Sequence, residues 1–269
     1  MGSVSRVIDP KALLSSYDAL LRDTPPSLPD GVRPERDGPV LRIVGQARGF
    51  VTVPSDPGVR GAELDALIAR QRDYFAARGE PVEWKTYGHD LPADLTERLR
   101  AAGFVPEARE SVLFARVADL AAEPAVPDGV TLRQVTAAAD MRRIAAMEAE
   151  VWSQDVSWMA DDLTARVAAD PAHIAVMVAE ARGRVVSAAW LVARPGTDLG
   201  GLWGGSTLAE WRGRGIYRAL VAARARVAAA WGLAYLQVDA TDDSAPILRR
   251  LGFHQVTTTT PYVWTPPRG

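Results

Sequence analysis

The chain has 269 residues, of which 48% are hydrophobic and 24% are charged, as in an ordinary soluble globular protein. It has no cysteine, three histidines and a net charge of −2. This composition excludes disulfides, thiolate catalysis and cysteine-based metal sites, and it offers no electrostatic footprint for nucleic acid or an anionic membrane. We expect no bound metal. Residues 1–22 lack the apolar core of a signal peptide, and no stretch predicts a membrane span, so we expect a cytoplasmic protein.

The first half of the chain predicts a small unit of alternating strands and helices. Apolar residues recur at helical spacing after Arg60-Gly61, and Gly79 ends that helix. In chain order, the expected elements are strands at 41–44 and 50–53, a helix up to 79, a strand at 82–87, a short helix at 95–100 followed by Gly103-Phe104, and a strand at 111–117.

Residues 121–129 contain two prolines and no hydrophobic periodicity, which indicates a linker. We therefore expect one domain at 1–120 and a second at 130–269. The elements expected in the second domain are a strand at 130–135, helices at 140–152 and 159–169, strands at 174–181 and 185–192, an extended segment at 201–208, a helix from 216 to 232, a strand at 233–239, a short helix at 245–251 and a strand near 262–264.

The sequence Arg212-Gly213-Arg214-Gly215 stands between the extended segment and the long helix. A glycine-containing turn at a helix start points several backbone N–H groups in one direction, and the helix dipole adds partial positive charge there. The two arginines add full charges. This pattern predicts a receptor for a pyrophosphate such as that of coenzyme A, with a plain solvated turn as the alternative.

The two halves present the same order of elements. Arg60 matches Arg212 and Gly103 matches Gly252, at an offset of about 150 residues. We infer an internal structural repeat, with two generic strand–helix segments as the alternative. Glu63 stands where the second half has Gly215, so a carboxylate would repel a bound pyrophosphate. The first half is therefore expected to lack the anion site.

The order strand, Arg-Gly loop, helix, strand, short helix and Gly252-Phe253 resembles the GNAT superfamily of N-acyltransferases over about residues 130–260. The loop is similar to that family's acyl-CoA signature, with Arg212 and Gly215 in the first and fourth positions and Tyr217 departing at the sixth. The resemblance implies an α/β (α+β) fold of tandem GNAT-like lobes, each a mixed, mostly antiparallel sheet flanked by helices. It also implies acetyl-CoA as co-substrate of the second lobe.

The resemblance assigns coenzyme A to the strand before the loop, the loop itself and the first turn of the helix. Gly204-Gly205 within that strand indicates a bulge or a close approach of the ligand. The cofactor-binding residues that we expect are Ser206, Thr207, Leu208, Arg212, Gly213, Arg214, Gly215, Ile216 and Tyr217.

The tyrosine that many GNAT enzymes use as general acid is replaced by Leu248, and Thr241 stands near the place of a common asparagine. Three explanations stay open. Another hydroxyl of Tyr217, Ser244 or Tyr262 protonates the leaving thiolate, the thiolate leaves unaided, or the lobe binds acyl-CoA without rapid turnover.

A general base is expected among the carboxylates near strand and helix ends, with solvated or capping roles as the alternative. Glu148, Glu150, Asp198 and Asp239 are the candidates, and Asp239 closes a mostly apolar strand. The residues predicted to take part in catalysis are Asp239, Glu148, Tyr217 and Ser244.

Four tryptophans fall on elements expected to surround the acceptor: Trp152, Trp158, Trp190 and Trp203. Aromatic faces beside carboxylates suit an amine, whereas core packing is the alternative for Trp190 and Trp203. We therefore expect an N-acetyltransferase that moves acetyl directly from acetyl-CoA to a small-molecule amine, as a monomer or homodimer. The alternatives are a non-catalytic acyl-CoA sensor and an acyltransferase with another donor or a hydroxyl acceptor.

Overall fold

The computed structural model describes residues 10–22, 28 and 31–267. Their contacts divide the chain into two compact units. The first unit comprises Met1–Leu113, Asp239–Ile247 and His254–Gly269, and the second comprises Phe114–Val238 and Leu248–Phe253. No helix in the described part of the chain is long and apolar enough to cross a membrane.

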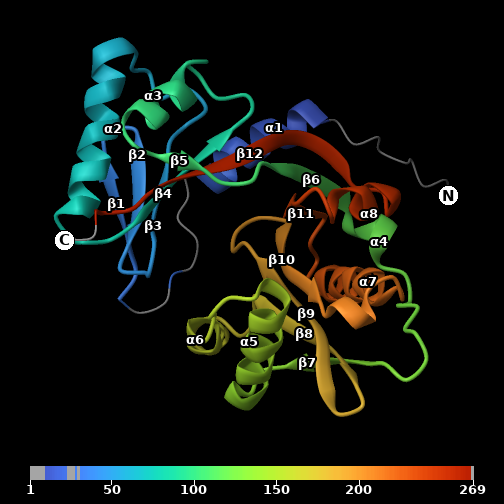
Figure 1. Ribbon diagram of the computed structural model, residues 1–269. Coiled ribbons are helices and arrows are strands. Elements are labelled where there is room, and N and C mark those ends of the chain that lie inside the picture. The colour runs from blue at the N-terminus through green and yellow to red at the C-terminus, as the bar shows by residue number, and fades with distance from the viewer. Residues whose placement is uncertain (1–9, 23–27, 29–30, 268–269) are drawn as a thin grey trace. The chain divides into compact units, whose positions relative to one another are not determined.

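The first unit is built on a sheet in the order β1-β2-β3-β4-β12-β6, with β5 paired to β12 (Figure 1). The pairs β1–β2, β2–β3 and β4–β12 are antiparallel, whereas β3–β4 is parallel. Its elements are α1 (Pro10–Tyr17), η1 (Asp18–Arg22), β1 (Arg33–Asp37), β2 (Val40–Val44), β3 (Gly49–Thr52), α2 (Gly61–Ala76), β4 (Val82–Tyr87), α3 (Leu95–Ala101), β5 (Val105–Pro106), β6 (Glu110–Arg116) and β12 (His254–Trp264).

Helix α2 covers this sheet because its apolar residues recur every three or four positions and form one buried stripe. Phe75, at the end of that stripe, lies against the backbone of β3. A Cβ at Gly49 would come within 2.0 Å of the Phe75 ring, so only glycine permits this close approach.

The last strand differs from the sequence expectation, which placed it at the end of the second unit. The structure pairs β12 with β4, with Tyr262 opposite Trp84, and both side chains lie in the core of the first unit. Thr259 Oγ1 donates to the carbonyl of Thr86 at 2.9 Å across the same pair. The alternation of apolar and polar residues predicts a strand but not the strand with which it pairs, so this pairing was not predictable. The boundaries 1–120 and 130–269 stay a prediction.

The second unit has the sheet order β11-β10-β9-β8-β7. The pairs β7–β8, β8–β9 and β9–β10 are antiparallel, whereas β10–β11 is parallel. Its elements are α4 (Val117–Leu120), β7 (Thr131–Val135), α5 (Ala138–Trp152), α6 (Trp158–Ala169), β8 (Ile174–Ala181), β9 (Arg184–Ala193), β10 (Leu199–Thr207), η2 (Ala209–Trp211), α7 (Ile216–Ala230) and most of β11 (Tyr235–Ala240). The division between the units falls within β6, β11 and α8 (Ala245–Arg250).

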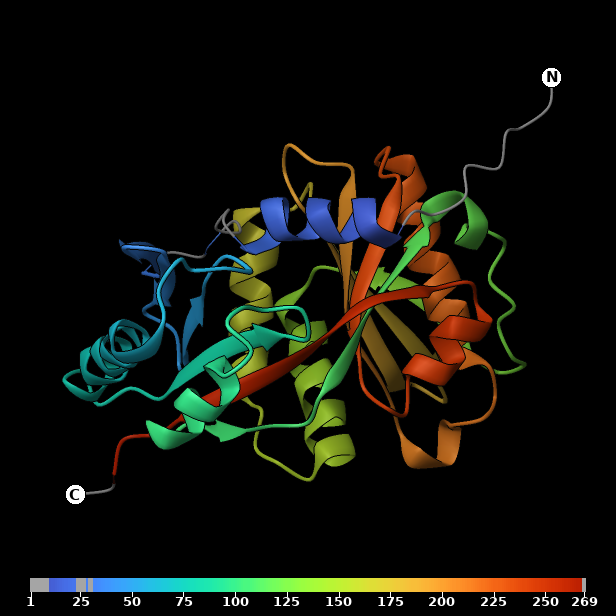
Figure 2. The same ribbon diagram turned by 90° about the horizontal axis from the view of Figure 1, so that it is seen from above.

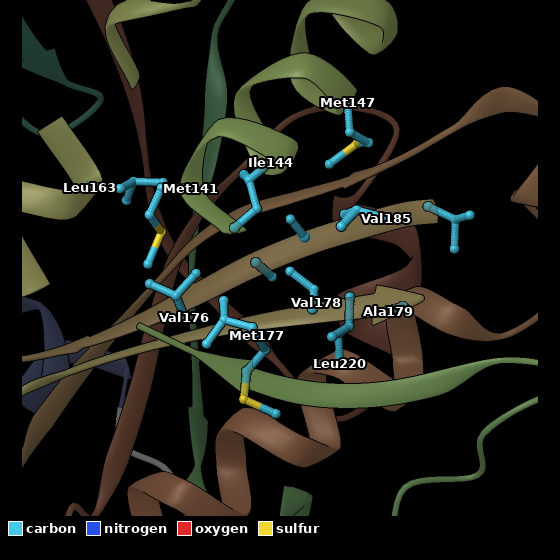
Figure 3. Packing of buried hydrophobic residues seen from close by; sticks show 14 of the residues in the cluster. Met141, Ile144, Met147, Leu163, Val176, Met177, Val178, Ala179, Val185 and Leu220 are labelled. Carbon is cyan, nitrogen blue, oxygen red and sulfur yellow. The ribbon is translucent and has the colours of Figure 1, made fainter. Parts of the chain in front are cut away.

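Helices α5 and α7 lie on opposite faces of this sheet (Figure 2). Met141, Ile144 and Met147 recur at helical spacing on α5 and are buried against one face of the sheet. On the other face, Met177 of β8 extends toward Leu220 of α7 (Figure 3). The β8 side chains are buried on both faces, which explains its nearly continuous apolar sequence.

The internal repeat is visible as a strand–helix–parallel-strand motif in each unit. In the first unit β3, α2 and β4 form it, with Gly49–Val51 paired to Val82–Trp84. In the second unit β10, α7 and β11 form it, with Leu199–Gly201 paired to Tyr235–Gln237. Each parallel pair contains three residues, and in each motif one strand continues beyond the paired segment.

Replacement of Tyr262 by alanine tests the placement of β12. The side chain is 3% exposed in the first unit's core, so Tyr262→Ala should lower the free energy of unfolding by about 3 kcal/mol. Val105 in the paired strand β5 is 65% exposed, and Val105→Ala should cost less than about 0.5 kcal/mol. Urea denaturation measures both; equal effects of the two changes would contradict the assignment.

Candidate active site

The parallel strands β10 and β11 separate beyond a short paired segment. Their pairing ends at Gly201 and Gln237, whereas β10 remains paired with β9 as far as Thr207. The register with β9 shifts between Gly204 and Ser206, which is the expected bulge. The bulge needs glycine, because φ is 67° at Gly204 and 92° at Gly205.

Aromatic side chains fill the space beside these glycines. A Cβ at Gly204 would lie 2.6 Å from the Trp190 ring, and one at Gly205 would lie 2.7 Å from the Tyr217 ring. Tyr217, the residue that departs from the acyl-CoA signature, therefore points toward the bulge. Burial raises the pKa of its hydroxyl, whereas the nearby Arg224 acts to lower it.

Arg224 bonds to the paired strands β9 and β10 next to the bulge. Its guanidinium is buried, and it donates from Nη1 to the carbonyls of Trp190 at 3.3 Å and Trp203 at 3.2 Å. Nε donates to the carbonyl of Leu220 in its own helix. No carboxylate in the described residues pairs with it, and burial lowers the pKa of Arg224 to about 10. An arginine on the apolar face of a helix is a sequence signal for such a role, yet Arg224 was not among the predicted site residues.

The loop before α7 has the geometry of an anion receptor. Gly213 and Gly215 have φ of 73° and 88°, and no side chain caps the helix. The first backbone hydrogen bond into the helix runs from the Ala219 amide to the Gly215 carbonyl. The amides of the first turn are therefore oriented outward, and a Cβ at Gly213 would meet nothing within 4 Å. The assignment of this turn to a diphosphate group stays a prediction.

The two arginines of the loop also stabilise its conformation. Arg212 donates from Nε to the carbonyl of Thr207 at 3.0 Å. Arg214 donates to the carbonyl of Glu210 at 2.9 Å, and its guanidinium lies 4.7 Å from the centre of the Trp211 ring. Both side chains remain exposed, so their charge stays available to an anion at the loop.

Several backbone groups at the end of β10 are bonded within the second unit. The carbonyl of Ser206 accepts from Ser187 Oγ at 2.6 Å, and that of Thr207 accepts from Arg212. The amide of Leu208 donates to the carbonyl of Val186 at 3.0 Å. The assignment of Ser206–Leu208 to the ligand stays a prediction.

Glu148 is the carboxylate that the fold brings to this strand. It is 2% exposed, and its Oε2 accepts from Trp152 Nε1 at 2.8 Å. Trp152 Nε1 also lies 3.2 Å from Ser206 Oγ, so α5 is linked to β10. Oε1 of Glu148 is buried without a hydrogen-bond partner. Burial raises the pKa of Glu148, and the hydrogen bonds of Ser206 and Trp152 counteract the shift.

The other two predicted catalytic residues, Asp239 and Ser244, belong to the first unit. Asp239 Oδ2 lies 2.6 Å from Lys85 Nζ, so an ion pair accounts for its burial. Ser244 Oγ donates to the carbonyl of Thr241 at 3.3 Å, as in a turn. Leu248, in the place of the family's tyrosine, is fully buried. Of the four predicted catalytic residues, Glu148 and Tyr217 are the two in the second unit.

The first unit fills the corresponding position with its own side chains. Arg22 donates from Nε to the carbonyl of Val53, just after β3, and its guanidinium lies 4.3 Å above the ring of Tyr87 at the end of β4. It also pairs with Asp90 at 2.7 Å. Arg60, at the start of α2, is bound by Asp56 at 2.7 Å. That the first unit binds no anion stays a prediction.

One family model matches much of the second unit. It is described as "Acetyltransferase (GNAT) family" and matches residues 139–253. No curated protein gives a significant match.

Solved GNAT structures resemble nearly the whole chain. A GCN5-related N-acetyltransferase from Kribbella flavida has a TM-score of 0.68 at 19% identity, covering 98% of both chains. A tandem GNAT protein from the clavulanic acid biosynthesis pathway has a TM-score of 0.62 at 15% identity, covering 96% of both. A third, a GCN5-related N-acetyltransferase from Sphaerobacter thermophilus, scores 0.59 at 16% identity and covers 95% of this chain and 85% of its own.

GNAT proteins are acyltransferases whose co-substrate is an acyl-CoA, and the open loop before α7 is compatible with that co-substrate. The mixed sheets with flanking helices also match the fold of the solved tandem relative. Residues 139–253 of this chain therefore match the GNAT acetyltransferase family, and the chain shares its fold with solved GNAT structures that include a tandem GNAT protein.

Proposed function

We propose that the protein is an N-acetyltransferase that moves an acetyl group from acetyl-CoA directly to a small-molecule amine. One observation carries this proposal: the buried carboxylate of Glu148, with a free Oε1, lies beside the bulged strand β10. A buried carboxylate oxygen that lacks a hydrogen-bond partner destabilises a fold. Its position is better explained by the binding and deprotonation of an amine than by packing. This argument favours a catalytic protein over an acyl-CoA sensor.

The second unit would hold the co-substrate through the loop and the first turn of α7. Backbone amides and the charges of Arg212 and Arg214 would neutralise the diphosphate. The acyl arm would follow β10 toward the bulge at Gly204-Gly205, where the strand has left β11. The thioester then supplies an activated acyl group and a thiol leaving group.

The transfer requires three proton movements. Glu148 would accept a proton from the acceptor ammonium, because only the neutral amine has a free electron pair. The amine nitrogen would then form a bond to the acyl carbon while the carbon–sulfur bond breaks, and the nitrogen would release its second proton to solvent to give the neutral amide. Tyr217 would donate its hydroxyl proton to the departing thiolate, and the cation of Arg224 would stabilise the phenolate that remains.

Isothermal titration of the chain with acetyl-CoA tests the binding site. We expect one molecule per chain, because the first unit has Arg22 and the Arg60–Asp56 pair in the corresponding position. Gly215→Glu should abolish binding, since a carboxylate would repel the diphosphate.

Gly215→Ala is the matched control, because both substitutions strain the same backbone at φ 88° and only one adds charge. Circular dichroism should show that both variants are folded. Titration should show that Gly215→Ala weakens acetyl-CoA binding less than Gly215→Glu does. A stoichiometry near two, or equal affinities of the two variants, would refute the loop assignment.

Glu148→Gln tests the base. The substitution keeps the shape of the side chain and removes its basicity, so kcat should fall by about 100-fold or more. Burial raises the folded-state pKa, so stability falls as the pH rises from the ordinary glutamate pKa through the raised one, and the full destabilisation by ionised Glu148 is present above it. The glutamine variant should therefore be at least as stable as wild type at pH 8. A folded variant with an unchanged rate would eliminate Glu148 as base.

The pH profile gives an independent test of Glu148. The protonated carboxylic acid cannot accept a proton, so kcat/KM should decline as pH falls through its raised pKa, which lies above the usual glutamate value of about 4.3. Acceptor amines of different pKa should share this limb of the profile. A limb that follows the pKa of the amine instead would assign it to the substrate.

Tyr217→Phe tests the acid. The ring remains to fill the space at Gly205, so acetyl-CoA affinity should be retained while kcat falls about tenfold or more. The rate is measured from the appearance of free thiol. An unaltered rate would mean that the thiolate leaves unaided.

A further inference from the structure

The apolar stripe of α5 contains a carboxylate. Ile144 and Glu148 are four residues apart, so they lie on the same face of the helix, and both are buried. Burial disfavours the charged form of a carboxyl group, whereas hydrogen bonds donated to it favour that form. The donors that reach Glu148 therefore decide how readily it ionises and where its oxygens point.

Trp152, one turn further along α5, supplies such a donor. Its Nε1 lies 2.8 Å from Glu148 Oε2 and 3.2 Å from Ser206 Oγ. One indole N–H is therefore shared between the carboxylate and strand β10, and the contact with the carboxylate is the shorter one. The terminal torsion of a glutamate side chain is broad, so a charge-assisted hydrogen bond to one oxygen restricts its orientation.

Packing of the indole does not account for its position. Val151, the preceding residue, packs against the core of the second unit, whereas Trp152 is 55% exposed. A tryptophan that leaves more than half of its surface in solvent gains only part of the hydrophobic free energy of a buried one. Its N–H group, in contrast, is bonded to oxygens of two different elements. The hydrogen bonds explain this side chain better than its apolar surface does.

Ser206 connects the donor to the bulge of β10. The register with β9 shifts between Gly204 and Ser206, so Ser206 is the first paired residue after the bulge. Its carbonyl accepts from Ser187 Oγ at 2.6 Å, which fixes the backbone there. Burial raises the pKa of Glu148, and the hydrogen bonds of Ser206 and Trp152 act to lower it. The carboxylate is thus held beside a fixed point of the strand.

We propose that Trp152 is the positioning residue of the base, with an indole N–H that holds Glu148 by one carboxylate oxygen and joins it to Ser206 after the bulge. This proposal rests on the proposed function, since it concerns the base of the same site. Trp152 acts through Glu148 and not on a reacting atom. A base that a third group orients presents its free electron pairs in one direction.

Two substitutions separate the donor from the ring. Trp152→Phe keeps a flat ring and removes the N–H, whereas Trp152→Gln keeps an N–H donor of similar reach and removes the ring. In Trp152→Phe the acidic limb of kcat/KM should move to higher pH, and kcat above the limb should fall about tenfold. In Trp152→Gln both should stay close to wild type. An unmoved limb in Trp152→Phe, or a larger loss in Trp152→Gln, would overturn the proposal.

Titration of Glu148 itself separates this proposal from the function on which it rests. The carboxyl carbon of Glu148 is followed by NMR in the protein without ligands, and Glu148→Gln assigns its signal. The midpoint should move to higher pH in Trp152→Phe, because a donor to the charged form is lost, and should be retained in Trp152→Gln. This result without thiol release would support the positioning role and refute catalysis. Equal midpoints in wild type and Trp152→Phe would overturn the proposal whatever the turnover.

Discussion

A buried guanidinium fixes the geometry on which the second unit's site depends. Arg224 bonds to the carbonyls of Trp190 and Trp203, which belong to the neighbouring strands β9 and β10. Buried backbone carbonyls need hydrogen-bond donors, and here one side chain supplies a donor to each of two strands. Because no described carboxylate neutralises it, the positive charge also remains available to Tyr217. One residue therefore stabilises the strand geometry and supplies a cation at the place proposed for the leaving thiolate.

The bulge follows from the same constraint. At Gly204-Gly205 the strand turns through two positive φ angles, and the space above each glycine contains an aromatic ring. Any side chain there would displace Trp190 or Tyr217. Gly204 and Gly205 thus permit the bulged backbone conformation, and the rings of Trp190 and Tyr217 pack against it. Leu248 in the family's tyrosine position is compatible with this arrangement, because Tyr217 reaches the bulge from the first turn of α7.

The features predictable from the sequence were local ones. Helix spacing, the Arg212–Gly215 loop and the glycine pair depend on residues adjacent in the chain, and the structure contains each of them. The contact of Trp152 with both Glu148 and Ser206 joins positions far apart in sequence, so Glu148 was one carboxylate among several candidates. The pairing of β12 with β4 could not be predicted for a related reason. The alternation of apolar and polar residues in a strand carries no information about which strand it pairs with. In the same way, nothing in the sequence around Asp239 indicates that it forms an ion pair with Lys85.

The two units show how one motif can keep or lose an open site. Both contain a parallel strand pair of three residues around a helix. In the first unit Arg22 bridges the ends of the strands and Asp56 neutralises the arginine before the helix. These contacts satisfy buried donors and charges, which stabilises the fold. Neither α2 nor α7 has a side-chain cap, so the two copies differ in the arginines before the helix rather than in the cap. Asp56 neutralises Arg60, whereas Arg212 and Arg214 donate to backbone carbonyls and remain exposed. A cation that pairs with a carboxylate is less available to an anion, so only the second copy keeps positive charge at the start of its helix.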